Sequence, residues 1–208
     1  YKSLFSSGHM VYNLSEKTEL KLSYSRRVNR PHDWHINPFT YRNGPFFERK
    51  GNPYLRPEYI NSWDFSYSAS GQILSVYIKD IEDMIRHVRQ SSDNDEVTTL
   101  TFVNLGNARQ SGIELISRFK PFPFIKFRAS INAFKTVIYH FSNDVEDTED
   151  DLNPATKGVR GRISTTIYLP KSVELQISSR FRAPRESAQG TVGGMGSLNI
   201  AVEKSILN

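Results

Sequence analysis

Ile125-Lys126-Phe127-Arg128-Ala129-Ser130-Ile131-Asn132 is the stretch of sequence that decides the fold. Apolar and polar residues alternate in it with a period of two, which places one kind of side chain on each face of a β-strand. The same alternation recurs along the chain, for example at 19–25, 62–69, 74–79 and 198–203. Each of these segments therefore predicts a strand with one apolar face and one polar face.

The pattern predicts nine strands, and the connections between them alternate in length. The strands are expected at 8–14, 18–28, 59–70, 72–88, 97–118, 125–141, 158–169, 173–184 and 195–206. Short turns at 15–17, 70–71, 120–123 and 170–172 alternate with longer links at 29–58, 89–96, 142–157 and 185–194. Successive connections of an up-and-down meander fall on opposite ends, so one end has tight turns and the other has long loops. We predict an all-β fold, an antiparallel up-and-down transmembrane β-barrel represented here by about nine strands.

The composition agrees with strands rather than membrane helices or disorder. The chain is 38% hydrophobic with a mean hydropathy of -0.50, and it has no run of about 18 apolar residues. Membrane barrels also have a hydrophilic average, because only one face of each strand is apolar. The aromatic share of 12% is high for a disordered chain. The lack of cysteine excludes disulfides, thiolate zinc sites and cysteine nucleophiles.

The charge pattern and the missing motifs exclude several classes of function. The net charge is +5, but the 27 Lys and Arg residues are scattered and form no single basic block, so we expect no nucleic-acid binding. No Ser-His-Asp order, glycine-rich phosphate loop or adjacent carboxylate pair stands out. We therefore expect no enzyme, no catalytic residue and no cofactor.

Several segments resemble the late barrel segment of TonB-dependent outer-membrane receptors of the Bacteroidetes type. The most specific is Gly51-Asn52-Pro53-Tyr54-Leu55-Arg56-Pro57-Glu58, and 22–31, 36–39, 104–114 and 198–208 resemble the same family. The resemblance implies a barrel of about 22 strands, closed by an N-terminal plug domain. It also implies location in the bacterial outer membrane and import of a scarce nutrient with energy delivered through TonB.

The resemblance and the strand count suggest that residues 1–208 are part of a single barrel domain. Bacterial barrels have an even number of strands, so nine is incomplete, and we expect the plug and the TonB-contacting segment to be absent from this chain. The expected partners are outer-membrane lipid, the remainder of the barrel and plug, the TonB complex through the absent segments, and an unknown small nutrient. A soluble β-rich binding or adhesion module and a structural barrel without transport are the alternative hypotheses.

The link 29–58 contains the candidate ligand-binding residues, since long loops on a rigid scaffold are common binding sites. The alternative is that its aromatic and proline residues pack the loop onto the barrel mouth. Histidine and aspartate at 32–35 are metal-ligand types, but a metal site needs three or four converging donors, and we expect none. The candidates are His32, Trp34, His35, Tyr41, Arg42 and Arg49.

Asn52, Pro53, Pro57 and Glu58 are interpreted as a structural motif. Each proline favours an extended conformation in the residue before it and so guides the loop back into a strand. Glu58 is expected to bind backbone amides or a basic neighbour.

Two further charged groups have open interpretations. The segment 144–151 has six carboxylates in eight residues but lacks the spacing of a calcium loop, and we expect a solvated loop. The second group is expected on the polar strand faces, where it would bind an anionic substrate or the plug. Its members are Arg118, Arg128, Arg160, Arg162, Arg180, Arg182, Lys126 and Glu174.

Overall fold

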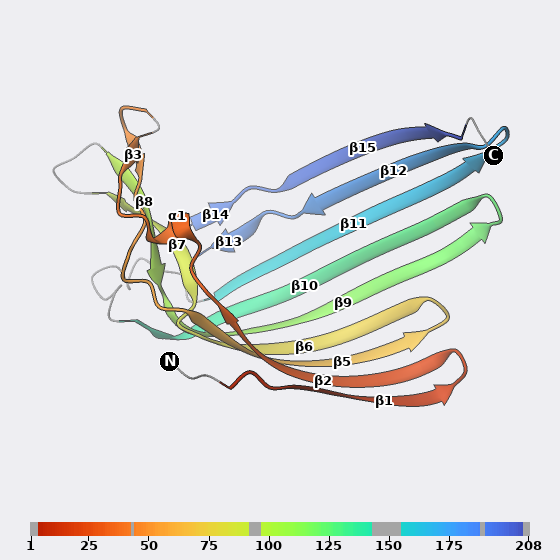
Figure 1. Ribbon diagram of the computed structural model, residues 1–208, viewed down its shortest axis with the longest axis horizontal. Coiled ribbons are helices and arrows are strands. Elements are labelled where there is room, and N and C mark those ends of the chain that lie inside the picture. The colour runs from red at the N-terminus through yellow and green to blue at the C-terminus, as the bar shows by residue number, and fades with distance from the viewer. Residues whose placement is uncertain (1–3, 43, 92–96, 143–154, 188–189, 206–208) are drawn as a thin grey trace.

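The alternating segments form one large antiparallel sheet in the computed structural model, which describes residues 4–42, 44–91, 97–142, 155–187 and 190–205 (Figure 1). The nine strands lie in the order β1-β2-β5-β6-β9-β10-β11-β12-β15, and this confirms the predicted fold class. Their bounds are β1 Ser7–Ser15, β2 Thr18–Asn29, β5 Glu58–Ala69, β6 Gln72–Glu82, β9 Gly106–Phe122, β10 Ile125–Phe141, β11 Ala155–Leu169, β12 Val173–Arg182 and β15 Met195–Lys204.

The sheet is open. Its edge strands β1 and β15 each pair with one neighbour, and no other described strand joins them. Unpaired backbone groups at a sheet edge are not tolerated within a bilayer. The open sheet curves as one arc of a barrel wall does (Figure 1).

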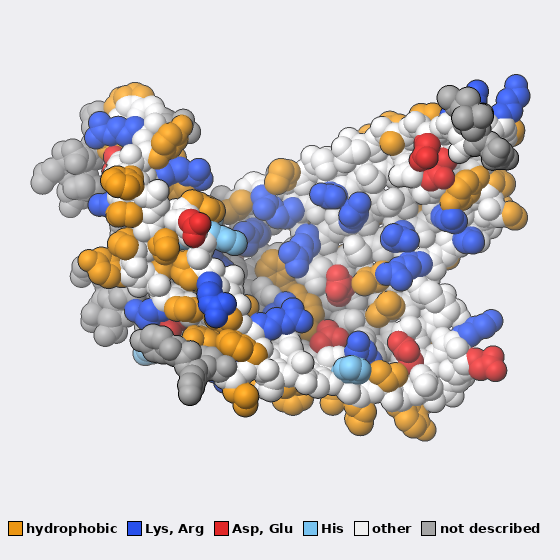
Figure 2. Space-filling model, in the orientation of Figure 1, with side chains coloured by type: hydrophobic (Ala, Val, Ile, Leu, Met, Phe, Trp, Pro, Cys, Tyr) orange, Lys and Arg blue, Asp and Glu red, His pale blue; other side chains and the backbone are white. Residues whose placement is uncertain are grey.

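The pairing register separates an apolar face from a polar face. Leu74, Leu115 and Ile131 lie opposite one another in a cross-strand row, each with more than 40% of its surface exposed. The neighbouring row of Ser75, Glu114 and Asn132 lies on the other face. Exposed apolar rows on one face are typical of lipid-facing barrel walls. Figure 2 looks into the hollow formed by the polar face, where Lys and Arg side chains gather over β11 and β12.

A second sheet, which we name the loop-end sheet, lies at the long-loop end. In it, part of the link 29–58 pairs with the hairpin of β7 and β8. Its order is β3-β4-β8-β7, and β4 runs parallel to β8. Within the described residues, α1 is the only helix, and no helix has the length and apolar character needed to cross a membrane. A short hairpin, β13 with β14, lies within the link 185–194. The bounds are α1 Asp33–Ile36, β3 Tyr41–Arg42, β4 Phe47–Arg49, β7 Ile85–Ser91, β8 Thr98–Asn104, β13 Arg185–Ser187 and β14 Gly190–Val192.

The prediction of single strands at 72–88 and 97–118 is wrong, because both segments break where the two sheets meet. Asp83 has a φ of 53° and Gly106 a φ of 121°, a left-handed region that strands do not use. At Gly106 a Cβ would also collide with the His140 carbonyl, so glycine is required there. The Met84 and Leu105 amides still donate across the hairpin at 2.8 Å. The hairpin therefore bends without losing its hydrogen bonds, and β7–β8 turn away from the wall.

The buried core is concentrated at this bend. Met84 is 2% exposed and Leu105 1% exposed, and both belong to a cluster with Ile81, Val88, Val103, Ala108 and Ile138. The apolar residues of the outward rows do not join it. The core thus joins the loop-end sheet to the wall.

The connections divide between the two ends of the sheet as their lengths predict (Figure 1). Tight turns lie at one end, and the loop-end sheet lies at the other. The turn expected at 120–123 is instead Pro123–Phe124, because β9 continues to Phe122. The acidic segment 144–151 lies outside the described residues.

Candidate functional site

Four arginines converge on the polar face of the wall, and we name them the arginine hollow. Arg160 lies directly opposite Arg182, and Arg162 lies opposite Arg180, on the neighbouring strands β11 and β12. They line a cavity of ≈ 540 Å³ that also borders β9, β10 and β15. Like charges placed directly opposite each other destabilise a sheet. This arrangement therefore has a stability cost that a bound anion would relieve.

The positive charge of the arginine hollow is poorly compensated within the described part of the chain. Glu114 is the only acidic residue among the described residues that line the cavity, and the ion pairs found among described residues involve none of the four arginines. The Nε atom of Arg182 is buried and has no hydrogen-bond partner in the part of the chain that the structure describes. Guanidinium groups bind carboxylates and phosphates through paired hydrogen bonds. The hollow is chemically suited to an anionic group of that kind.

The other predicted polar-face residues extend this basic surface toward the tight turns. Arg118 lies opposite Arg128, and the Lys126 ammonium donates to the Tyr168 hydroxyl. The Glu174 carboxylate accepts a hydrogen bond from Gln176 at 2.7 Å. The register places all of them on the polar face, as the alternation predicts. The polar face is thus basic along β9–β12.

At the long-loop end, the structure brings three of the six candidate loop residues together, two of them on Phe102 of β8 and the third on one of these two. The His35 ring stacks on Phe102 with centroids 4.2 Å apart, and the Trp34 ring meets Phe102 edge-on at 4.9 Å. His32 contacts His35 at 5.2 Å. His87 of β7 approaches Phe102 at 6.3 Å. Sequence reasoning missed Phe102 and His87, because only the bend of the hairpin brings them over the loop.

The other three candidates lie on the short strands β3 and β4. Tyr41 lies opposite Arg49, and the Arg42 guanidinium is 3.5 Å from the Glu48 carboxylate. Tyr41, Arg49 and Trp34 line a cavity of ≈ 200 Å³, whereas His32, His35 and Arg42 do not. The cavity is small, and ring packing accounts for much of the aromatic cluster. Both interpretations of the loop, ligand contact and packing, therefore stay open.

The electrostatics of the loop end lower the pKa of two histidines, His35 and His87. Burial, together with the neighbouring His32, lowers the pKa of His35. Burial also lowers the pKa of His87, and the nearby cations of Arg86, Arg89, Arg185 and Arg49 lower it further. Within the described residues, no group of three or more His, Asp or Glu side chains is placed to hold a metal ion.

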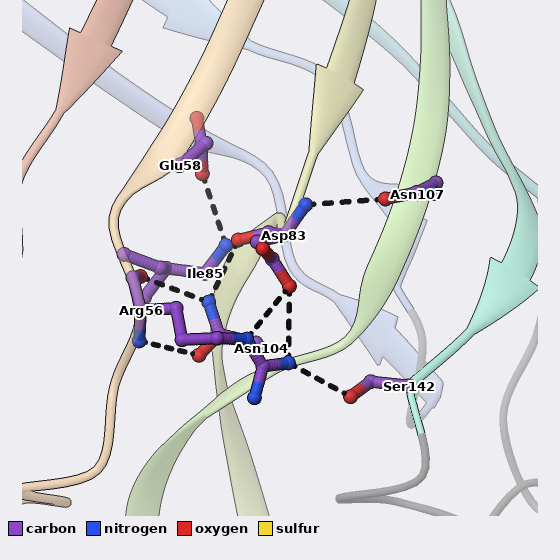
Figure 3. A network of polar contacts seen from close by, with 7 residues as sticks. All are labelled: Arg56, Glu58, Asp83, Ile85, Asn104, Asn107 and Ser142. Carbon is purple, nitrogen blue, oxygen red and sulfur yellow. Dashed lines mark hydrogen bonds and ion pairs between the residues drawn. The ribbon is translucent and has the colours of Figure 1, made fainter. Parts of the chain in front are cut away.

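A polar network fixes the returning loop to the bend (Figure 3). The Asn104 side chain is 1% exposed; its Oδ1 accepts from the Arg56 amide at 2.9 Å, and its Nδ2 donates to the Arg56 and Asp83 carbonyls. The side-chain amide of Asn104 therefore pairs with the backbone of Arg56 in the way that the backbone of a neighbouring strand would. The Arg56 guanidinium donates to Asp83 at 3.0 Å and to Ser142 at 3.1 Å. One loop residue is thus bound to three different parts of the bend.

The predicted structural motif lies within the same region. The Glu58 carboxylate, 5% exposed, accepts from the Ile85 amide at 2.9 Å and lies 3.8 Å from the Arg86 guanidinium. Asn52 donates to the Phe102 carbonyl at 3.0 Å and accepts from the Tyr54 amide. Pro53 lies in a turn at 53–54, where the Leu55 amide donates to the Asn52 carbonyl at 3.3 Å, and Pro57 directly precedes β5. The function of these four residues as a motif stays a prediction.

The sequence matches the outer membrane protein beta-barrel family over residues 1–208. No curated protein matches it. Solved structures share its fold at low sequence identity. The copper transporter OprC aligns with a TM-score of 0.62 at 16% identity, over 98% of this chain and 31% of OprC.

Two receptors of Pseudomonas aeruginosa align in a similar way. The siderophore receptor PirA has a TM-score of 0.59 at 13% identity, over 97% of this chain and 36% of PirA. A point mutant of the ferric enterobactin receptor PfeA, in complex with enterobactin, has a TM-score of 0.58 at 13% identity, over 97% of this chain and 33% of PfeA.

The chain thus spans about a third of the length of the structures that it matches. At these identities the likeness concerns the fold, and the match over the whole sequence establishes the family. The lipid-facing rows and the basic polar face agree with it. The chain belongs to the outer membrane protein beta-barrel family, and its nine-stranded sheet is an arc of barrel wall in the bacterial outer membrane.

Proposed function

We propose that this chain is part of an outer-membrane receptor that imports a small nutrient with energy delivered through TonB. In this proposal the arginine hollow binds an anionic group of the nutrient during its passage. The observation that carries it is the convergence of four arginines on one open cavity of the polar face, with a single carboxylate among the described residues that line it. The similar solved structures include siderophore receptors and a copper transporter, which supports a transport function for the barrel.

The proposed topology places the long loops outside the cell. Outer-membrane barrels have short periplasmic turns and longer extracellular loops, and the connections here divide in that way (Figure 1). The loop residues Trp34, Tyr41 and Arg49, which share the smaller cavity, would then meet the nutrient before the arginine hollow does.

Growth tests on intact cells check the transport proposal. One strain lacks the full-length protein, a second lacks TonB activity, and both are compared with the parent on a panel of single nutrient sources. We expect at least one anionic nutrient on which both strains fail, with growth of the first restored by the wild-type gene. If the deletion impairs the envelope but no nutrient separates the strains, the protein is a structural barrel without transport.

Two variants, one that removes the positive charges and one that keeps them, then test the arginine hollow. Changing Arg160, Arg162, Arg180 and Arg182 to Gln should abolish growth on that nutrient, whereas changing all four to Lys should preserve part of it. Exclusion of vancomycin from the cells provides the second readout. Loss of growth with vancomycin still excluded supports substrate binding, and entry of vancomycin with normal growth shows that the arginines hold the plug instead.

A further inference from the structure

A cross-strand row of three polar residues interrupts the apolar outer face of the wall. Lys135 of β10 lies directly opposite Ser111 of β9 on one side and Lys157 of β11 on the other. Their outward direction follows from the next residues along the strands, because Phe134 and Gly158 pair with each other on the inner face, where Arg160 covers the Phe134 ring. All three residues of the row are exposed. We name this row the outer lysine row.

The two lysines lack a partner for their charge among the described residues. The ion pairs found there involve neither of them. One step further toward the loops, the outward-facing Arg109 is neutralised by Asp80 at 2.6 Å. The described residues therefore neutralise a neighbouring outward cation but leave two adjacent ammonium groups uncompensated. An anion from outside the described chain would complete the row.

The height of the row on the wall places it at a membrane surface. Below it, the outward row of β10 is apolar from Ile125 to Ala133. Lys135 follows Ile125 by 10 residues, about 33 Å along the strand at about 3.3 Å per residue. A strand tilt of about 40° reduces this to about 25 Å, which is the height of the apolar band of such barrels.

Aromatic side chains mark the opposite boundary of the band. Phe122 and Phe124, 55% and 50% exposed, stack at the tight turn beside Ile125, and aromatic girdles flank the apolar band of barrels. Lys135 and Lys157 thus lie at the level of the lipid headgroups in the leaflet on the long-loop side. A charge at the midplane would be much more costly than one at this level.

We propose that Ser111, Lys135 and Lys157 bind the phosphate group of an outer-leaflet glycolipid, the phosphorylated disaccharide of lipid A. Two ammonium groups and a hydroxyl supply donors for a phosphate, and the apolar rows below accept the acyl chains. The leaflet follows from the topology proposed above, whereas binding of the phosphate does not depend on transport. A lipid titration of the purified protein therefore separates this proposal from the proposed function.

The experiment uses the full-length protein in detergent, titrated with lipid A and followed by native mass spectrometry. Lys135→Gln with Lys157→Gln should weaken binding about 10- to 30-fold, because each lysine near an anionic headgroup contributes a substantial share of the attraction. Lys135→Arg with Lys157→Arg should retain it. The matched control is Lys21→Gln with Lys126→Gln, which removes two charges from the inner face and should bind as the wild type does.

Three results would overturn the proposal. One is unchanged binding by the Gln variant. Another is equal binding of lipid A and its fully dephosphorylated form. The third is lysine-dependent binding of phosphatidylglycerol without binding of lipid A, which would assign the row to a phospholipid leaflet.

Discussion

The barrel wall and the loop-end sheet are built from similar strands but use their apolar residues in opposite ways. In the wall, Val76 and Leu115 remain 49% and 45% exposed on the outer face. At the bend, Met84 and Leu105 are almost completely buried among other side chains. In the wall, lipid takes the place of a protein core, and a side-chain core forms only where the hairpin leaves the wall. Stability in the two regions should therefore respond to different changes.

The largest effect is expected from Asn104→Ala at the bend. Its side chain makes three hydrogen bonds to backbone groups of Arg56 and Asp83, and each buried group left without a partner costs about 1–3 kcal/mol. We expect a loss of about 3 kcal/mol or more, seen as faster hydrogen exchange in the loop-end sheet. Asn199→Ala, at an exposed site of β15, should change stability by less than about 0.5 kcal/mol. Equal exchange in both variants would show that the network does not hold the bend.

A charge on the outer face of the wall should have the next largest effect. Ile163 lies opposite Ala129, near the middle of the apolar band, so Ile163→Arg should cost about 2–4 kcal/mol in the free energy of unfolding from lipid vesicles. Ser164→Arg, one residue further on the polar face, should cost much less. Trp63, an outward residue 51% exposed, supplies a second measurement. A lipid-soluble quencher should reach it but not Trp34 of the loop end, and the reverse result would invert the two regions.

The smallest effect concerns pH and should be confined to the loop end. The pKa of His87 is lowered in the folded protein, so between that value and about 6.5 the unfolded chain binds more protons. Its contribution to stability is therefore complete above pH 6.5 and declines as the pH falls toward the folded pKa. Trp34 fluorescence should report this loosening, Trp63 fluorescence should not, and His87→Gln should reduce it. A change of equal size at both tryptophans would contradict a local origin.

The alternating pattern was sufficient to predict the wall, because side-chain direction in a strand depends only on local sequence. It predicted the number of strands in the wall and the face on which Arg160 and Arg182 lie, but it continued two of the strands through the bend. It could not predict that these arginines meet, since pairing register depends on residues far apart in the chain. The bend escaped prediction for a related reason. Apolar residues continue through Met84 and Leu105, so hydrophobicity does not change where the strands break.

The loop-end cluster was only partly predictable. Trp34 and His35 were identified from their chemistry within a long link, but their partner Phe102 lies in a segment that reads as ordinary strand. Asn104 lies in a segment that resembles the family, yet nothing in its neighbours indicates that its amide replaces a strand partner for Arg56. Such contacts follow from the bend, and the bend is a tertiary feature.

The left-handed residues Asp83 and Gly106 also define a graft boundary for protein engineering. The hairpin continues its hydrogen bonds through the bend, while the core and the Asn104 network hold the loop-end sheet to a few residues of the wall. A recombinant chimaera that joins another barrel at 83 and 106, and carries 29–58 with it, would transplant the loop-end sheet as a unit together with its anchor. Cutting the same hairpin within β7 and β8 would instead separate the aromatic cluster from the residues that support it.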